Sequence, residues 1–450
     1  MVASSAKKKE KQRLAYKESQ KLAALPGRIS TREAKSEWGY VLLAEPVLAK
    51  GATRPEHSVM LSFQRLGLDW LTALALTASS ACAVHPLHAQ RPPSRWTVSS
   101  APTVRIGTGD SDTTGLLAFV TGATRLPSGA IVVADRGPFS LLEFDARGTF
   151  VRRFARKGSG PGEIEYLASL FRCGNQYLSN DIANGPRINV YGLDGTFMRA
   201  FRFRTPPGAP AVYDSACNPR GQFVHFAFES GGGIGVYRKP VAFWLSGSDS
   251  TVTVKLGEFP GSERWGTKTG SRPLPLGKQP RVAIGRDRVY IGTADRYEIL
   301  VFSTTGTPLP PITRAAAPMT VTSADIEAAL ESDVSQFGER SRKSTTEQYA
   351  AMTLPKTLPP YRALTVDAAD LLWVQDYPRA GSAVVTWRVF GADGRTAAEV
   401  VLPAALEVYE IGLDYVLGRA VDENDGVPEV RLFALRRTPA NLSPTRSNPS

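Results

Sequence analysis

The stretch from Leu126 to Phe154, LPSGAIVVADRGPFSLLEFDARGTFVRRF, decides the fold. Two apolar runs, Ala130–Ala134 and Leu141–Phe144, lie between turns rich in Gly, Pro and Asp, and a third run, 149–154, loosely alternates apolar and polar residues. Runs of this length bounded by such turns are typical of short strands, and Gly148 supplies the positive φ that a tight hairpin requires. The stretch therefore predicts a meander of short antiparallel strands.

The same pattern recurs along the chain, because an aromatic residue is followed four positions later by glycine in five places. These pairs are Phe144/Gly148, Tyr191/Gly195, Phe243/Gly247, Phe302/Gly306 and Phe390/Gly394, and Phe433 begins a sixth, incomplete copy. The copies lie 43 to 59 residues apart, except for one interval of 88 that contains an insertion. Short strands repeated at such a period are typical of propeller blades of four strands each.

The ends of the repeat region complement each other. The last copy has no outer strand after it, whereas an additional strand, Thr103–Gly107, precedes the first copy. Pairing the two would close the ring and remove an exposed sheet edge. The sequence therefore predicts an all-β, six-bladed β-propeller over residues 95–437, with a helical insertion at 314–360 between blades four and five and a disordered tail at 438–450.

Three segments resemble the NHL-type six-bladed propeller, most closely exported bacterial propellers of unassigned activity. They are Lys157–Glu163 (KGSGPGE), Val133–Asp135 (VAD) and Arg187–Tyr191 (RINVY). The resemblance covers about Arg95 to Arg437 and departs in blade three, at Gly231–Gly233. It implies the fold but not the activity, because that family contains both binding proteins and enzymes.

The positive charge is not concentrated on the repeat region. The chain of 450 residues has a net charge of +12, and residues 1–59 carry half of it. The remainder is dispersed, which argues against nucleic acid as the main partner. We interpret 1–59 as a non-native or disordered extension, with translation starting near Met60; the alternative is a cytoplasmic basic tail followed by a buried helix.

Residues 60–89 have the pattern of a secretory signal peptide. Arg65 precedes an apolar run, Trp70–Ala78, and small residues allow cleavage after Ala83 or Ala89. The run is shorter than the ~20 residues of a transmembrane span. We therefore predict a periplasmic or secreted protein without a transmembrane span, and Cys82 leaves a cell-surface lipoprotein open.

Acidic and basic residues recur at one position of several blades, close to the end of the second strand. The aspartates are Asp135, Asp181, Asp295 and Asp376, and the nearby arginines are Arg136, Arg187, Arg296 and Arg379. The plainer interpretation is that the carboxylates bind the backbone of their own turns. The functional interpretation is a rim of carboxylates and guanidiniums that holds Ca²⁺, an anion or a sugar.

Histidine and cysteine restrict the chemistry further. Once residues 1–89 are removed, His225 is the only histidine left, which excludes a multi-histidine metal site. A Ser-His-Asp triad through His225 would lack the Gly-x-Ser-x-Gly elbow that positions the nucleophile. Cys173 and Cys217 occupy corresponding places in adjacent blades, where an oxidising compartment would favour a disulfide. The alternative is two buried thiols, because neighbouring inner strands can stand beyond the ~7 Å Cα limit.

The insertion has the signature of an amphipathic helix. Thr322 and Asp325 fit a capping box, an apolar stripe runs from Ile326 to Phe337, and Arg340–Lys343 would end the helix. The helix either packs on the propeller flank or forms a lid over one channel mouth.

From these features we expect a binding or recognition module without a required cofactor, whose partner is a small molecule, a glycan or a protein. The alternative is a metal-dependent lactonase or ester hydrolase, because the resemblance extends to gluconolactonase-type propellers. No residue of this sequence is assigned as a metal ligand or as catalytic.

Overall fold

The computed structural model describes most of the predicted propeller region. The described residues are 32–36, 39–43, 94–107, 117–183, 187–203, 212–227, 232–248, 251–268, 270–422 and 426–438. The predicted signal peptide 60–89, with Cys82, lies outside them, as do most of the extension 1–59 and all but the first residue of the tail 438–450. Within the extension, β1 (Arg32–Ser36) pairs antiparallel with β2 (Gly39–Leu43).

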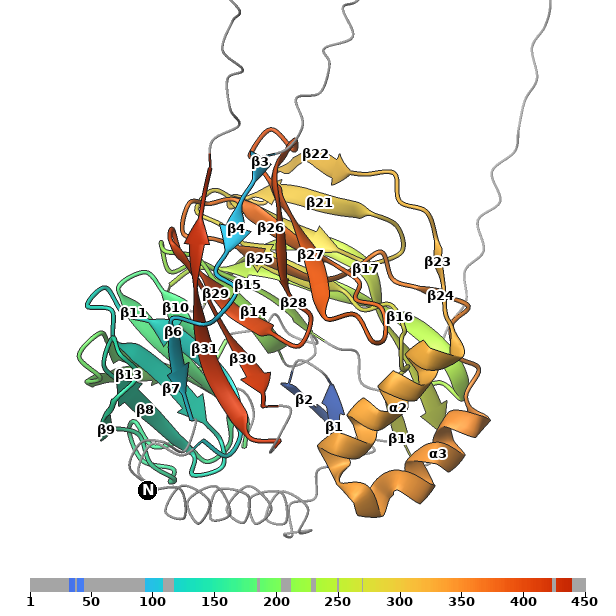
Figure 1. The fold of residues 1–450 in the computed structure, drawn as a ribbon, viewed down its shortest axis with the longest axis horizontal. Helices are drawn as coiled ribbons and strands as arrows, with labels where there is room; N and C mark the ends of the chain where they lie inside the picture. Colours follow the sequence, from blue (N-terminus) through green and yellow to red (C-terminus); the bar gives the residue numbers. More distant parts are fainter. Residues whose placement is uncertain are drawn as a thin grey trace, which may run out of the picture. The chain divides into compact units, whose positions relative to one another are not determined.

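The protein is mostly β, and six sheets of four or five strands follow one another along the described chain (Figure 1). The first sheet contains β6 (Val120–Arg125), β7 (Ile131–Asp135), β8 (Ser140–Phe144) and β9 (Phe150–Arg153). The second contains β10 (Leu167–Cys173), β11 (Gln176–Asp181), β12 (Arg187–Gly192) and β13 (Phe197–Phe201). The third contains β14 (Val212–Cys217), β15 (Phe223–Ala227), β16 (Gly235–Ser246), β17 (Val252–Thr267) and β18 (Gly270–Pro273).

The other three sheets follow the same order. The fourth contains β19 (Arg281–Ile284), β20 (Arg288–Gly292), β21 (Glu298–Ser303) and β22 (Pro308–Thr313). The fifth contains β25 (Tyr361–Val366), β26 (Leu372–Asp376), β27 (Val384–Phe390), β28 (Thr396–Pro403) and β3 (Ser94–Arg95). The sixth contains β29 (Glu407–Ile411), β30 (Tyr415–Val421), β31 (Pro428–Arg436), β4 (Thr97–Val98) and β5 (Val104–Ile106). Consecutive strands of each sheet form an antiparallel meander; the N-terminal strands β4 and β5 join β31 antiparallel, and β3 joins β28 in parallel.

Burial within a sheet follows the sequence. Every residue of β7 (IVVAD) is buried, because apolar side chains point to both faces of this central strand. The outer strand β9 (FVRR) has three exposed residues of four, and the outer strand β13 is similar. In the first two sheets, apolar strands therefore lie inside and more exposed strands form the outer edge.

Hydrophobic clusters join each sheet to the next. One cluster joins sheets one and two, others join two to three, three to four, four to five and five to six, and one joins six to one. The last contains Ile131 and Phe144 of the first sheet, Leu417 and Leu432 of the sixth, and Ile106 of β5. Burial of each such side chain contributes roughly 1.5–3 kcal/mol.

The N-terminal strand β5 is the outer strand of the sixth sheet. Val104 pairs with Leu432 and Ile106 with Val430, both on β31. Gly148, in the hairpin turn of the first sheet, lies directly against it with φ +86°: a Cβ there would stand 2.9 Å from Val104 Cγ1 and 3.1 Å from the Arg105 carbonyl oxygen. The recurrent glycine therefore serves both the turn and the close approach of two sheets.

The third sheet has the longest strands, β16 with 12 residues and β17 with 16, and it is the sheet in which the sequence repeat is least regular. Prolines at 240 and 260 interrupt the regular pairing of β16 with β17, and beyond them the hairpin continues to β18. This extension places Arg272 beside the helical insertion.

The insertion is a separate helical hairpin. Its neck is the pairing of β23 (Met319–Thr320) with β24 (Thr357–Leu358), and it contains α2 (Ser323–Phe337), a 3₁₀ turn (Glu339–Ser341) and α3 (Arg342–Ala351). The capping box at Thr322 and Asp325 is present. The expectation that Arg340–Lys343 ends the helix is wrong: α2 ends at Phe337, with Gly338 as its C-cap, and the basic run leads into α3. The second helix, α3, was not predicted because its sequence, RKSTTEQYAA, has only a weak apolar stripe.

Candidate functional site

Two of the four predicted site aspartates accept hydrogen bonds from backbone N–H groups. Asp135 is fully buried and accepts hydrogen bonds from the N–H groups of Ala118, Phe119 and Gly137 at 2.7–3.0 Å. Burial raises the pKa of Asp135, and these hydrogen bonds oppose the rise. Asp181 repeats the arrangement with the N–H groups of Glu165 and Tyr166. These contacts are those of the plainer interpretation, in which the carboxylates organise loops.

The other two aspartates form ion pairs. Asp295 lies 2.6 Å from Arg238 and 3.4 Å from Lys278. Its pKa is lowered: partial burial opposes the shift, and the Arg238 guanidinium outweighs it. Asp376 receives two hydrogen bonds from Arg388, at 3.1 and 2.9 Å.

The four predicted arginines have separate local partners. Arg136 is buried, with its guanidinium over the ring of Phe119 at 3.7 Å. Arg187 pairs with Asp181 at 2.7 Å, and the exposed Arg296 pairs with Glu298 at 2.7 Å. Arg379 contacts Asp325, which belongs to the insertion, at 3.0 Å.

Among these described contacts, only Asp181 and Arg187 of the eight predicted residues bind each other directly. A shared ligand for the eight stays a prediction.

The cysteines and the histidine have structural surroundings. Cys173 and Cys217 form a disulfide between the second and third sheets, with their Cα atoms 5.5 Å apart. His225 is buried on β15, where its Nε2 lies 2.6 Å from Ser246 Oγ and its ring stacks on Phe203 at 4.7 Å. Burial lowers the pKa of His225 to about 4, so this side chain is neutral at pH 7.

Metal donors are not gathered in the part of the chain that the structure describes: no group of three or more His, Cys, Asp or Glu side chains there could hold an ion. Calcium binding stays a prediction.

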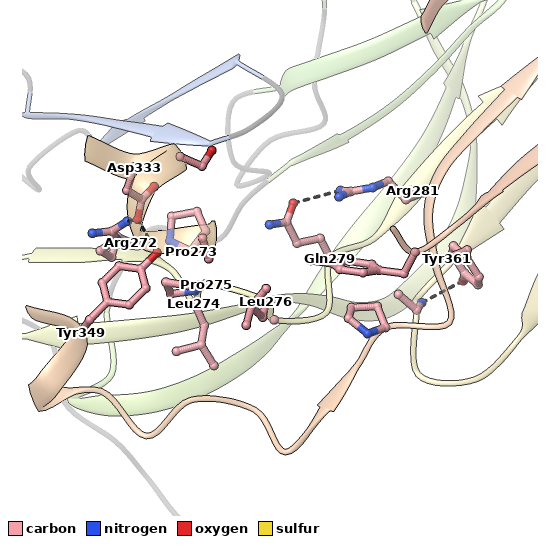
Figure 2. Close-up of a pocket in the computed structure, with 16 residues that line it drawn as sticks. Arg272, Pro273, Leu274, Pro275, Leu276, Gln279, Arg281, Asp333, Tyr349 and Tyr361 are labelled. Carbon is pink, nitrogen blue, oxygen red and sulfur yellow. Dashed lines mark hydrogen bonds and ion pairs between the residues drawn. The ribbon is translucent and has the colours of Figure 1, made fainter. Parts of the chain in front are cut away.

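A cleft lies where the insertion meets the third, fourth and fifth sheets (Figure 2). Helices α2 and α3 supply one wall, and the segment from β18 to β19 supplies the other. The lining residues are Arg272, Pro273, Leu274, Pro275, Leu276, Gly277, Gln279, Arg281, Ala294, Ala329, Ser332, Asp333, Tyr349, Pro359, Tyr361 and Tyr377.

One end of the cleft is a charged network. The Arg272 guanidinium pairs through Nη2 with Asp333 Oδ2 on α2 and donates through Nη1 to Gln348 Oε1 at 3.1 Å. The hydroxyl of Tyr349, on α3, donates to the same Asp333 oxygen at 2.8 Å. Side chains from β18 and α3 therefore converge on one carboxylate oxygen of α2.

The other end is built from the fourth and fifth sheets. Arg281 donates to Gln279 Oε1 at 3.0 Å and to the carbonyl oxygen of Arg362. The Tyr361 hydroxyl accepts from the N–H of Ala294 at 2.8 Å, and burial raises its pKa, so it stays protonated. Figure 2 shows Pro273–Leu276 between the two ends, as an apolar floor.

The backbone of the cleft is strained. Among the described non-glycine residues, four have φ in the left-handed region, and two of these, Leu276 (+59°) and Ala294 (+61°), line the cleft. Such conformations cost about 1–3 kcal/mol each and concentrate at functional sites.

Sequence reasoning missed this cleft. The available signal was Arg272–Arg281 (RPLPLGKQPR), in which arginines and prolines crowd one short connection. Nothing in the sequence places that connection against a helical insertion some 60 residues away.

Comparisons with known proteins identify similar structures but no family. No family model and no curated protein matches the chain. A protein described as exported, from Bacteroides fragilis, is 17% identical, with 77% of this chain and 97% of that chain covered and a TM-score of 0.43.

Two other solved structures cover the same share of this chain, 77%. A DUF4221 family member from Bacteroides vulgatus is 9% identical, with 98% of its own chain covered and a TM-score of 0.40. The calcium-binding protein regucalcin from Agrobacterium tumefaciens is 12% identical, with 97% covered and a TM-score of 0.35.

In the described part of the protein, neither helix is long and apolar enough to cross a membrane.

Proposed function

We propose that this protein is an exported binding module, built on a closed six-bladed β-propeller, that takes a small ligand in the cleft beneath the helical insertion. The closed ring is supported by the hydrophobic cluster between the first and sixth sheets and by the pairing of β5 with β31. In this arrangement each sheet is one blade, and the insertion at 314–360 covers the cleft; whether it also forms a lid over a channel mouth stays a prediction.

The observation that carries the proposal is the composition of the cleft. Polar side chains converge at both ends of an apolar floor, and the half-buried ring of Tyr377 supplies aromatic surface. Small-molecule sites combine an apolar lining with a few placed polar groups. The strained residues Leu276 and Ala294 add a cost that packing alone does not require.

Export is supported by two features of the chain. Residues 60–89 have the pattern of a cleaved signal, and Cys173 and Cys217 form a disulfide, which persists in oxidising compartments. The mature protein would then begin near residue 84 or 90. N-terminal sequencing of the native protein tests this step directly.

The cleft is tested by filling it. Ser332 is exposed on α2 and lines the cleft, whereas Ser335 is exposed on the same helix and does not line it. A library of small metabolites is screened by thermal shift against the native protein, and the compounds that stabilise it are repeated on Ser332→Trp and Ser335→Trp. We expect Ser332→Trp to abolish the shift and Ser335→Trp to keep it. Compounds that stabilise both variants equally would place the binding site elsewhere.

The same thermal assay separates the hydrolase alternative. Titration with Ca²⁺ and Zn²⁺ should leave the melting temperature unchanged if the protein binds its ligand without a metal. A gain specific to one metal would favour the metal-dependent lactonase or ester hydrolase instead.

A further inference from the structure

The charged groups of the cleft are unequal in number. Its lining includes two arginines, Arg272 and Arg281, and one carboxylate, Asp333. The side chains of Arg272 and Asp333 are each only about one-fifth exposed (21% and 20%), so water screens their interaction less than that of a surface pair. A partly buried, net positive cleft favours anionic ligands.

The contacts of Asp333 define a carboxylate-binding position. One oxygen, Oδ2, is bound by the Arg272 guanidinium and by the Tyr349 hydroxyl, and Gln348 accepts from the other nitrogen of the same guanidinium. Charged hydrogen bonds of this kind are about twice as strong as neutral ones. Any carboxylate or phosphate oxygen at this position would receive the same two donors.

The carboxylate that fills this position belongs to a weakly attached element. The six hydrophobic clusters that join the described sheets include no residue of 319–358. The insertion buries apolar side chains of its own, Val334, Tyr349 and Met352, but these belong to none of the six clusters. Its described hydrogen bonds and ion pairs to the sheets, besides those of the neck, include those of Arg272 with Asp333 and Gln348, and of Asp325 with Arg379 and the N–H of Ala380. Segments held in this way open at low free energy.

We infer that Asp333 occupies, in the empty protein, the subsite for the anionic group of the ligand, and that the ligand is a sugar-sized molecule carrying one carboxylate or phosphate. This inference rests on the proposed function, because it names the ligand class of that same cleft. The anion displaces Asp333 from Arg272 and Tyr349, so binding loosens the contact that holds α2 over the cleft.

The rest of the cleft selects the body of the ligand. The half-buried side chains of Pro273, Pro275, Leu276 and Tyr377 provide apolar surface for the C–H face of a pyranose. Gln279 and Arg281 lie at the opposite end (Figure 2), and Ser332 lies on the helical wall. Amide, hydroxyl and guanidinium groups pair with sugar hydroxyls, so the cleft accommodates an anion at one end and hydroxyls at the other.

The experiment compares three probes by isothermal titration calorimetry on the mature protein: glucuronate, glucose 6-phosphate and glucose. Asp333→Asn removes the competing charge. Glu331→Gln is the matched control, because Glu331 is an acid of the same helix that pairs with Arg342 and does not line the cleft.

We expect at least one anionic probe to bind and glucose not to. If the contact with Asp333 is closed about nine-tenths of the time, Asp333→Asn tightens anion binding roughly tenfold. Glu331→Gln should leave the dissociation constant unchanged. Whether glucuronate or glucose 6-phosphate gains more distinguishes a carboxylate from a phosphate ligand.

Three results would overturn the inference: no binding of either anion to Asp333→Asn, equal binding of glucose, or the same gain in Glu331→Gln. The melting temperature of each variant is measured in the same buffer, so that loss of binding is not mistaken for unfolding. If Asp333→Asn is unstable, Asp333→Ala repeats the test. The proposed function survives these failures if other compounds still lose their thermal shift in Ser332→Trp.

Discussion

Replacing Gly148 by alanine tests whether the N-terminal strand closes the ring. The residue has φ +86°, and an added Cβ would stand 2.9 Å from Val104 Cγ1 and 3.1 Å from the Arg105 carbonyl oxygen, both on β5. Gly381 is the matched control, because it has φ +73° and nothing within 4 Å of its Cβ position. The two substitutions share the conformational cost and differ in the neighbouring strand.

The magnitudes follow from that difference. A left-handed conformation costs an L-residue roughly 1–2 kcal/mol, which both variants incur. Overpacking adds roughly 1–3 kcal/mol, and only at Gly148, because a backbone carbonyl cannot move aside as a flexible side chain can. Gly148→Ala should therefore lose about 1–3 kcal/mol more than Gly381→Ala in the free energy of unfolding.

The assay is urea unfolding of the mature protein and both variants, followed by tryptophan fluorescence and circular dichroism. Coincident transitions by the two probes validate the comparison of midpoints. Equal losses in the two variants would refute the reasoning, because the strand 104–106 would then not lie against the turn of the first sheet.

Three further outcomes are expected. Burial lowers the pKa of His225 to about 4, so as the pH falls the unfolded chain binds a proton at this residue before the folded protein does, and the free energy of unfolding should drop by about 3 kcal/mol between pH 6.5 and pH 4. This part of the drop should vanish in His225→Gln. A native-like pH dependence in that variant would contradict the assignment. Thiol labelling of the unfolded, unreduced mature protein should find neither Cys173 nor Cys217 free, and their replacement by serine should cost roughly 2–5 kcal/mol; full labelling would show two thiols. Asp135→Asn should cost roughly 1–3 kcal/mol in thermal or urea unfolding, because an amide NH₂ cannot accept from the backbone N–H groups that the carboxylate binds, and an unchanged variant would argue against that loop-organising role.

The sequence by itself determined the repeating unit. Aromatic residues such as Phe144 and glycines such as Gly148 recur because each sheet needs a buried anchor and a tight turn, and both requirements are local to one hairpin. The capping box at Thr322 and Asp325 could be predicted from the sequence for the same reason, because its hydrogen bonds join residues three positions apart.

Only the tertiary structure decided what the polar residues do. Asp135 and Asp376 occupy the same place in the repeat, yet Asp135 binds N–H groups of the segment that precedes β6, whereas Asp376 binds Arg388 on the next strand, β27. Which of these nearby partners lies within reach depends on how the strands and loops of each sheet fold. The cleft is the extreme case: Arg272 meets Asp333 only because the third sheet extends past its prolines and the insertion folds back over it. Local sequence encodes turns and strands, whose partners are near in the chain, whereas a binding site joins segments whose proximity depends on the packing of the whole fold.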